Sequence, residues 1–203
     1  MNPIWEAEIR NIEFSHCEIS TADLVFIGSS SIASWTTLKE DFKIYTVVKA
    51  GFGGSKIQDA IDYFDRIVKP YGPKLILLFS GTNDLSGDLD SATPEYVCEK
   101  VEEFMKLAQV KLPQSKLFYL SLTPAPCRFN VLNDVIKANR LIKHLAKTGG
   151  FTFIDMQASF LDQGMPKLEL FCEDALHMNK KGYENWLTVI KPMVDHAMRK
   201  HCL

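Results

Sequence analysis

Three serines stand at the end of a short apolar run, where a hydroxyl could act as a nucleophile. Leu24 to Gly28 is followed directly by Ser29, Ser30 and Ser31. A short apolar run bounded by glycine and small polar residues predicts a buried strand, and serine is a favoured N-cap of a following helix. On such a turn, the N–H groups beside the serine can stabilise the oxyanion that forms when its hydroxyl attacks a carbonyl. The alternative interpretation is that the serines only cap a helix.

A histidine and an aspartate near the end of the chain could activate that hydroxyl. His177 supplies an imidazole, and Asp174 lies three residues before it on the same predicted loop. A hydroxyl nucleophile needs a base and a group that orients the base. The pair could instead bind a metal, but no second histidine or cysteine lies at ligand spacing. We therefore predict a site without a metal and a protein without a cofactor.

Two further groups could hold the oxyanion. Gly54, which ends the run Gly51-Phe-Gly-Gly54, could offer a backbone N–H that no side chain obstructs, and Asn83 could offer its side-chain amide. The glycines could also form a plain turn or a phosphate cradle. The dinucleotide-binding pattern requires a third glycine and a P-loop requires Gly-Lys-Ser/Thr, and neither is present here. Asn83 and Asp84 alone would more often form an Asx turn.

Short apolar runs predict the strands that carry these groups. Amphipathic segments separate them, which is the pattern of an α/β fold with a parallel sheet covered on both faces. The predicted strands are 24–28, 44–48, 74–79, 117–122 and 151–154. The serines, the Gly53-Gly54 pair, the Asn83-Asp84 pair and the pair of Asp174 and His177 all follow carboxyl ends of strands. They should therefore meet at the edge of the sheet where α/β proteins bind ligands.

Helical spacing and helix signals complete the predicted elements. Helices are expected over 3–13, 32–38, 57–68, 93–108 and 135–145 and from 179 onward. Thr93 should cap its helix with Pro94 at the first helical position, whereas Pro192 should kink the last helix or end its regular part. The stretch 155–176 has weak periodicity, which is typical of a functional segment or of short helices. Solvated side chains are expected for His16, His144, His196 and His201.

Composition narrows the class of protein. The 203 residues are expected to form a single domain, 1–203, and a formal net charge of −2 without a basic block argues against nucleic acid or an anionic membrane as partner. The cysteines are odd in number and lack a CxxC pair, which favours free thiols in a reducing compartment. No apolar run approaches the ~20 residues that span a bilayer. The first residues carry acids rather than an apolar core, so we expect a cytoplasmic protein.

Taken together, four blocks of the sequence resemble the SGNH-type branch of the GDSL hydrolases, in the order and with the separations of that family. The blocks are Phe-Ile-Gly28-Ser-Ser30-Ser, Gly51-Phe-Gly-Gly54, Gly81-Thr-Asn83-Asp and Asp174-Ala-Leu-His177. The resemblance runs from Asp23 to the last helix. It implies a three-layer α/β/α fold around a five-stranded parallel sheet in flavodoxin-like order.

The resemblance also implies roles for the residues of these blocks. Ser30 would be the nucleophile, and Asp174 and His177 would complete the triad. Gly54 and Asn83 would join the backbone N–H of Ser30 in the oxyanion hole. One position departs from the family, because Ser29 stands where an aspartate usually precedes the nucleophile.

We therefore predict a serine esterase that hydrolyses a small soluble ester, with a short acyl group or a sugar O-acetyl group, through an acyl-enzyme. An acyl-thioesterase or a lysophospholipase-like hydrolase is the nearest alternative. Phosphodiester hydrolysis would need a metal or a basic pocket. The alternative without catalysis is a flavodoxin-like module that binds a ligand at the same sheet edge. Oligomeric state does not follow from the sequence.

The walls of the substrate pocket are also expected from the sequence. Pro124 and Pro126 stiffen the loop after the fourth strand, and the stretch 155–176 leads into the catalytic block. These two segments should line the pocket, with Phe129 and Phe171 closing over a short acyl group. Arg128, which follows the proline loop, is a candidate substrate-binding residue, and a surface role is equally open.

Overall fold

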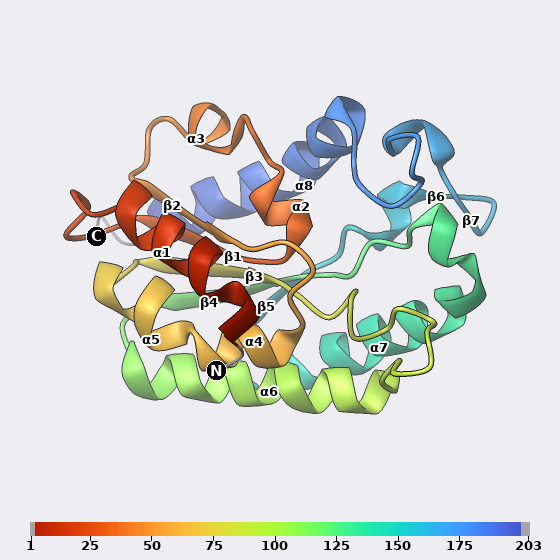
Figure 1. Ribbon diagram of the computed structural model, residues 1–203, viewed down its shortest axis with the longest axis horizontal. Coiled ribbons are helices and arrows are strands. Elements are labelled where there is room, and N and C mark those ends of the chain that lie inside the picture. Colours follow the sequence, from red (N-terminus) through yellow and green to blue (C-terminus); the bar gives the residue numbers. More distant parts are fainter. Residues whose placement is uncertain (1–2, 200–203) are drawn as a thin grey trace.

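The computed structural model describes residues 3–199, in which five parallel strands form a sheet between two layers of helices (Figure 1). The strands are β1 (Leu24–Gly28), β2 (Val47–Gly51), β3 (Leu75–Phe79), β4 (Lys116–Leu120) and β5 (Thr152–Ile154). Their order is β2-β1-β3-β4-β5, and each neighbouring pair is parallel. The predicted fold class and flavodoxin-like order are confirmed.

Helices cover both faces of the sheet (Figure 1). One face packs against α1 (Glu6–Ser15), α4 (Ile57–Asp62), α5 (Phe64–Ile67), α6 (Pro94–Lys111) and α7 (Leu132–Leu145). The other packs against α2 (Ser30–Ala33), α3 (Leu38–Asp41) and α8 (Lys180–Arg199). Short 3-10 turns lie at Pro3–Trp5, Lys69–Tyr71, Pro126–Val131, Gln157–Phe160 and Leu168–Leu170. Among the described residues, no helix is long and apolar enough to cross a membrane.

The central strands are buried along their whole length. Every residue of β1 and of β3 is buried, with Val25 and Ile27 facing one helical layer and Leu24 and Phe26 facing the other. A parallel strand covered on both faces has no polar side, so its sequence is an unbroken apolar run. This is why the central strands could be predicted within a residue or two of their observed bounds.

Several predicted details agree with the structure. Thr93 caps α6, because its Oγ1 accepts a hydrogen bond from the Tyr96 N–H at 3.2 Å, and Pro94 is the first helical residue. The stretch 155–176 holds two short 3-10 turns and a small antiparallel hairpin of β6 (Leu161–Asp162) and β7 (Met165–Pro166). His144 and His196 are exposed, whereas His201 lies outside the described residues.

One predicted strand was misplaced, and one of two alternatives for the last helix was wrong. The second strand is Val47–Gly51 rather than 44–48, and Ile44 is 72% exposed. β2 is an edge strand, where Lys49 replaces the apolar residue that the prediction required, so the β-branched residues before it were given too much weight. For the last helix, a kink or an end at Pro192 was predicted; the end is wrong, because α8 continues through Pro192 to Arg199. Buried side chains on both sides of the proline, Trp186 and Ile190 before it and Val194 after it, keep the helix on the sheet despite the lost backbone hydrogen bond.

His16 is buried, contrary to the prediction that it is solvated. Its side chain closes the outer edge of β2: Nδ1–H donates to the Ile12 carbonyl at 2.8 Å, and Nε2 accepts from the Lys49 N–H at 3.3 Å. A carbonyl can only accept and an N–H can only donate, so both partners require the neutral ring. Burial is the main cause that lowers the pKa of His16 below its usual value. The imidazole therefore protects an edge strand that would otherwise expose its backbone.

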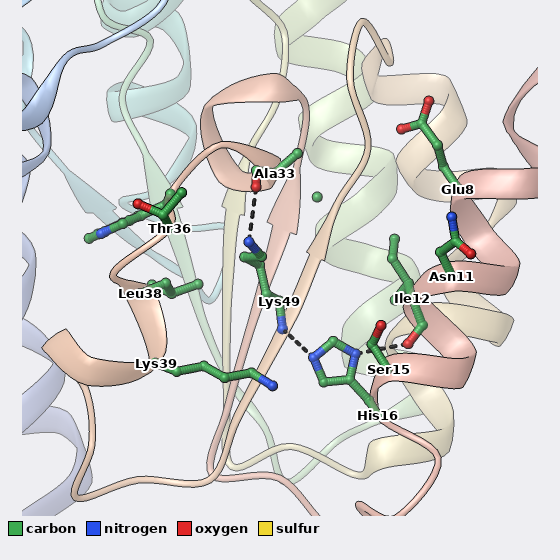
Figure 2. A pocket seen from close by; sticks show the side chains of 12 residues that line it. Glu8, Asn11, Ile12, Ser15, His16, Ala33, Thr36, Leu38, Lys39 and Lys49 are labelled. Carbon is green, nitrogen blue, oxygen red and sulfur yellow. Dashed lines mark hydrogen bonds between the residues drawn. The ribbon is translucent and has the colours of Figure 1, made fainter.

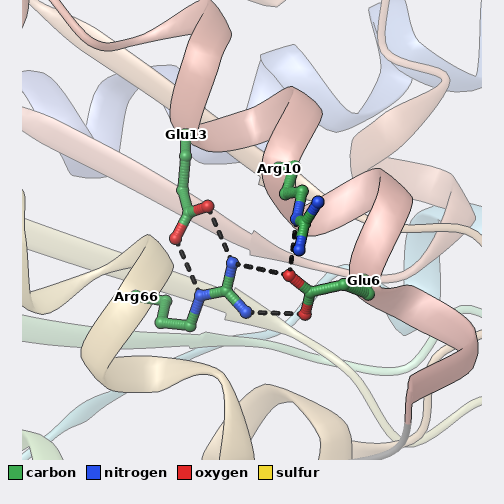
Figure 3. A network of polar contacts seen from close by, with 4 residues as sticks. All are labelled: Glu6, Arg10, Glu13 and Arg66. Carbon is green, nitrogen blue, oxygen red and sulfur yellow. Dashed lines mark hydrogen bonds and ion pairs between the residues drawn. The ribbon is translucent and has the colours of Figure 1, made fainter.

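A polar network fixes α1 against α5 (Figure 3). The Arg66 guanidinium donates to Glu13 at 2.7 and 2.8 Å and to Glu6 at 2.7 and 3.3 Å, and Glu6 also accepts from Arg10 at 2.8 Å. Two-pronged arginine–carboxylate pairs in a network hold geometry better than isolated surface pairs. The same helix reaches the sheet edge through Glu8, whose Oε2 accepts from the Gly53 N–H at 2.9 Å. α1 thus supports the loop that carries Gly54.

Candidate active site

The turn formed by Ser29 and Ser30 packs closely against the ends of β1, β2 and β3. β1 ends at Gly28, α2 begins at Ser30, and Ser29 between them is only 2% exposed. A Cβ on Gly28 would lie 2.1 Å from the Phe79 carbonyl oxygen of β3, and a Cβ on Gly51 of β2 would lie 2.2 Å from the Ala33 nitrogen of α2. Only glycine permits so close an approach of backbone to backbone. Both glycines therefore serve to place Ser30.

Ser30 is the first residue of α2, so its N–H belongs to the first helical turn, which has no intrahelical acceptor for it. The turn is also tied to the last helix, because the Tyr183 hydroxyl donates to the Ser31 carbonyl at 3.0 Å. The hydroxyl of Ser30 and an available backbone donor thus come from the same rigid turn. This arrangement suits a nucleophile beside an oxyanion site.

The loop before α8 brings an imidazole to that hydroxyl. His177 Nε2 lies 3.2 Å from Ser30 Oγ, and His177 Nδ1 lies 2.6 Å from Asp174 Oδ2. With the proton on Nδ1 donated to the carboxylate, Nε2 is left to accept from the serine hydroxyl. The sequence-predicted Ser30, Asp174 and His177 are therefore brought together as nucleophile, orienting group and base are in acyl-transfer sites.

Asp174 is held as a carboxylate by its neighbours. Its Oδ1 accepts from the N–H groups of Leu176 and His177, both at 2.9 Å. The hydrogen bond from the His177 ring, followed by those from the two backbone groups, lowers the pKa of Asp174 to about 2. The group is therefore ionised throughout the range in which an imidazole titrates, and it can stabilise a positively charged ring.

Backbone contacts hold the loop in place. The Cys172 N–H donates to the His177 carbonyl at 2.7 Å, and the Cys127 N–H donates to the Ala175 carbonyl at 3.1 Å. Ala175, between the candidate aspartate and histidine, has a φ of +54°, which is uncommon for a residue with a side chain. Neither thiol lies between the serine and the imidazole in this network, so the cysteines support the loop through their backbone.

Gly54 and Asn83 lie on two neighbouring loops of the same sheet edge. Gly54 has a φ of +76°, and its N–H has no hydrogen-bond partner among the residues that the structure describes. The Asn83 amide donates through Nδ2 to the Ser55 carbonyl at 3.0 Å, which leaves its second N–H available. Both predicted oxyanion donors therefore remain able to donate.

Arg128 contacts Asn83 directly. Its Nη2 donates to Asn83 Oδ1 at 3.1 Å and its Nη1 to the Thr82 carbonyl at 2.7 Å. Arg128 also lines the cavity beside Ser30, as its predicted role in substrate binding requires. Two of its N–H groups are nevertheless already used, and one of them fixes which side of the asparagine amide faces the site. Sequence reasoning missed this contact, which joins residues 45 positions apart and leaves no local pattern.

Asp84 is a second residue whose role the sequence did not reveal. It is 1% exposed, and its Oδ2 accepts from the Ile57 N–H at 3.1 Å, at the start of α4. Burial raises the pKa of Asp84 to about 6, although the hydrogen bond to Ile57 opposes this shift. The carboxylate links the loop that carries Asn83 to the segment after Gly54. Its position directly after Asn83 was the available signal.

A small cavity of about 30 Å³ opens beside Ser30. It is lined by Ser30, Ser31, Phe79, Thr82, Asn83, Leu85, Thr123, Ala125, Arg128, Val135 and Leu176. The two loops predicted to wall the pocket do so, but through Ala125 and Leu176. The predicted phenylalanine walls were wrong: Phe171 is buried against Phe160 in the core, and Phe129 is 49% exposed and absent from the lining. Within the part of the chain that the structure describes, no group of three His, Cys, Asp or Glu side chains could hold a metal ion.

Comparison with known proteins supplies a family. The profile of the GDSL-like lipase/acylhydrolase family matches residues 27–184, which includes the four blocks around the candidate site apart from Phe26, the first residue of the first block. The alpha2 subunit of human platelet-activating factor acetylhydrolase IB is 25% identical over 191 residues, covering 90% of this chain and 79% of that protein. The bovine and mouse proteins of the same name are also 25% identical over 191 residues.

Solved structures share the fold. A GDSL-like lipase from Bacteroides thetaiotaomicron superposes with a TM-score of 0.75 at 20% identity, covering 95% of this chain and 96% of that one. An acetylxylan esterase from Geobacillus stearothermophilus, solved as a catalytic mutant, superposes with a TM-score of 0.71 at 13% identity, covering 86% of this chain and 94% of that one. The sheet order and its helical layers are therefore those of acylhydrolases.

Proposed function

The chain belongs to the GDSL-like lipase/acylhydrolase family, and from that premise we propose that it hydrolyses a short-chain carboxylic ester through an acyl-enzyme on Ser30. The family and the named relatives make the chain an ester-hydrolysing enzyme. The observation that carries the finer proposal is the chain of contacts from Ser30 Oγ to His177 Nε2 at 3.2 Å and from His177 Nδ1 to Asp174 Oδ2 at 2.6 Å.

In the proposed reaction, Ser30 Oγ attacks the ester carbonyl while His177 Nε2 takes its proton. Asp174, already ionised, keeps the Nδ1–H in place and stabilises the imidazolium that forms. The imidazolium then gives the proton to the leaving alcohol, and the acyl group stays on Ser30. A water molecule, activated by the same imidazole, attacks the acyl-enzyme, releases the acid and restores the serine.

We propose that three donors hold the oxyanion of both tetrahedral intermediates: the N–H groups of Ser30 and Gly54 and the free N–H of the Asn83 amide. Fixed donors aimed at the developing charge are usually the largest electrostatic contribution to such reactions. Arg128 is proposed to act through Asn83. It holds the amide oxygen at 3.1 Å and keeps Nδ2 turned toward the site, and its positive charge makes the amide N–H a better donor.

The cavity favours the smallest acyl groups. Its volume of about 30 Å³ is about two to three times the ~10–15 Å³ that one water molecule needs, which favours a short acyl group over an extended chain. Two of the similar proteins are named for acetyl esters, an acetylhydrolase and an acetylxylan esterase. An acetyl ester of a small alcohol or a sugar is therefore the proposed substrate, ahead of a long-chain thioester or a lysophospholipid.

The cysteines support a further part of the proposal. Cys17, Cys98, Cys127 and Cys172 are free thiols, and three of them are exposed. Exposed free thiols are typical of a reducing compartment, so we propose that the enzyme works in the cytoplasm. Cys202 lies outside the described residues.

The experiment that tests the proposed substrate class is a series of nitrophenyl esters from acetyl to octanoyl, assayed on the wild type and on Ser30→Ala. We expect kcat/KM to be highest for acetyl to butyryl esters and to fall by octanoyl, because the small cavity cannot bury further methylenes worth about 0.8 kcal/mol each. Ser30→Ala should lose about 10⁴- to 10⁶-fold in kcat. A rate that keeps rising past octanoyl would contradict the proposed acyl preference, and an unaffected Ser30→Ala variant would contradict the nucleophile.

A further inference from the structure

A second and much larger cavity lies at the outer edge of the sheet, between α1 and the segment after α2 (Figure 2). Its volume is about 400 Å³, and its walls are α1, the exposed side of β2, and the segment that runs from the end of α2 to α3. None of its lining residues lines the cavity beside Ser30. Pockets that bind small ligands usually measure about 300 to 1,000 Å³, so this hollow could take a whole small molecule.

Two lysines face this cavity from different elements. Lys49 projects from β2, and its Nζ donates to the Ala33 carbonyl at 2.9 Å, while Lys39 extends from α3 toward His16 and the backbone of Lys49 (Figure 2). Among the residues that the structure describes, neither lysine forms an ion pair with a carboxylate. Lys49 has two further N–H donors and Lys39 has three.

The other titratable groups of the cavity balance these two positive charges only in part. His16 is neutral, because its two ring nitrogens are engaged by the Ile12 carbonyl and the Lys49 N–H. The Glu8 carboxylate, on the part of the wall formed by α1, accepts from the Gly53 N–H at 2.9 Å rather than from a lysine. Burial and the nearby Lys39 charge both lower the pKa of Lys49, as expected when two like charges share a hollow without a counter-ion.

We propose that this cavity binds a small phosphorylated molecule, with its phosphate between Lys39 and Lys49. A phosphate dianion would be attracted by both ammonium groups and would remove their mutual repulsion. Asn11, Ser15 and Thr36, which also line the cavity, offer hydrogen bonds to the hydroxyl groups of a sugar. The volume exceeds what a free phosphate needs, which favours a phosphate attached to a small polar body.

The test is isothermal titration calorimetry, in which the wild type is titrated separately with ribose 5-phosphate, with inorganic phosphate and with ribose. We expect saturable one-to-one binding of ribose 5-phosphate, weaker binding of inorganic phosphate and none of ribose. Lys39→Gln and Lys49→Gln should each weaken ribose 5-phosphate binding at least about tenfold, because each removes a charged hydrogen-bond donor. Lys39 is exposed, so we expect Lys39→Gln to fold like the wild type, and its loss of binding would then report on the site itself.

Two control variants keep the test specific. Lys147→Gln removes an exposed positive charge in the turn after α7 and should leave the affinity unchanged. Ser30→Ala should also leave it unchanged, so that failure of the proposed esterase and failure of this site are distinguishable. The inference is overturned by an absence of saturable binding, by an equal loss in Lys147→Gln, or by loss of binding in Ser30→Ala. Equal affinity for inorganic phosphate would overturn the assignment to a phosphorylated molecule.

Discussion

The candidate site has two halves that are held in different ways. Ser30, Gly54 and Asn83 sit at the ends of buried parallel strands, where close backbone contacts leave space only for glycine at positions 28 and 51. Asp174 and His177 sit on a loop, and their side chains are 49% and 39% exposed. The first half is fixed by packing, whereas the second is fixed by a few hydrogen bonds.

The two ways of holding these groups match what each group does during the reaction. The serine and the oxyanion donors must already be in place when charge develops, because preorganised dipoles then cost no reorganisation. The imidazole has to take a proton from one oxygen and give it to another. The loop is held by the Cys172–His177 and Cys127–Ala175 backbone hydrogen bonds, and we expect it to allow small adjustments of the ring. Variants in each half should therefore fail in different ways.

In the loop half, a large effect should come from Asp174→Asn. The substitution keeps the size of the side chain but removes the charge that stabilises the imidazolium and the acceptor that fixes its tautomer. We expect kcat to fall by about 10⁴-fold on an acetyl ester, with little change in KM. Asp155→Asn is the matched control, because Asp155 is an exposed carboxylate that pairs with Lys143 at 2.8 Å rather than with an imidazole. A loss of less than tenfold in Asp174→Asn would show that the Asp174 carboxylate is not required.

A smaller effect is expected in the sheet half from Asn83→Ala. The substitution removes one proposed oxyanion donor, so kcat should fall by about 10²- to 10³-fold while KM changes little. Steady-state kinetics on the acetyl ester separate the two parameters. If KM rises while kcat holds, Asn83 binds the ground state of the substrate and is not an oxyanion donor.

Arg128→Gln tests how Arg128 acts, because it leaves the Asn83 amide in place but removes the guanidinium that orients it. We expect a loss of about tenfold in kcat for Arg128→Gln alone and no additional loss when it is combined with Asn83→Ala, because residues that act through one contact are not additive. Arg128→Lys should recover part of the rate. Fully additive losses would show that Arg128 acts on the substrate independently of Asn83.

The smallest expected effect is on the free energy of unfolding, through His16, which contacts the edge strand β2 that leads to Gly54. Burial lowers the pKa of His16 in the folded protein, so the unfolded chain takes up this proton first as pH falls below the ordinary value of about 6.5. The stabilisation by neutral His16 is therefore present above that pH and is lost as pH falls. We expect the free energy of unfolding in urea to decrease between pH 7.5 and 5.5, by at most about 1.4 kcal/mol per pH unit from this group.

His16→Gln is the matched variant for that measurement. It removes the ionisation while keeping a polar side chain, so it should be less stable than the wild type at pH 7.5 and should depend less on pH. Subtracting the two curves cancels the contribution of Asp84, whose raised pKa of about 6 acts in the opposite direction. Parallel curves for the two proteins would contradict the role given to His16.

The sequence contained most of the fold and most of the candidate site, for a physical reason. Central parallel strands are covered on both faces, so 24–28 and 74–79 could be located from their apolar residues alone, and each polar block follows a strand end. What the sequence could not show depends on tertiary contacts. Neither the burial of His16 against β2 nor the contact of Arg128 with Asn83 has a local pattern. The start of β2 was misplaced because an edge strand needs less apolar surface than the prediction assumed.

The central claim is that the strand-end serine and the loop imidazole together make Ser30 the nucleophile, and covalent labelling tests it most directly. The protein is treated with a fluorophosphonate probe, and the modified residue is located by mass spectrometry of its peptides. The account predicts one adduct, on Ser30, that forms much more slowly in Asp174→Asn and not at all in Ser30→Ala. An adduct on Ser29, Ser31 or Cys127, or labelling that is equally fast in Asp174→Asn, would contradict it.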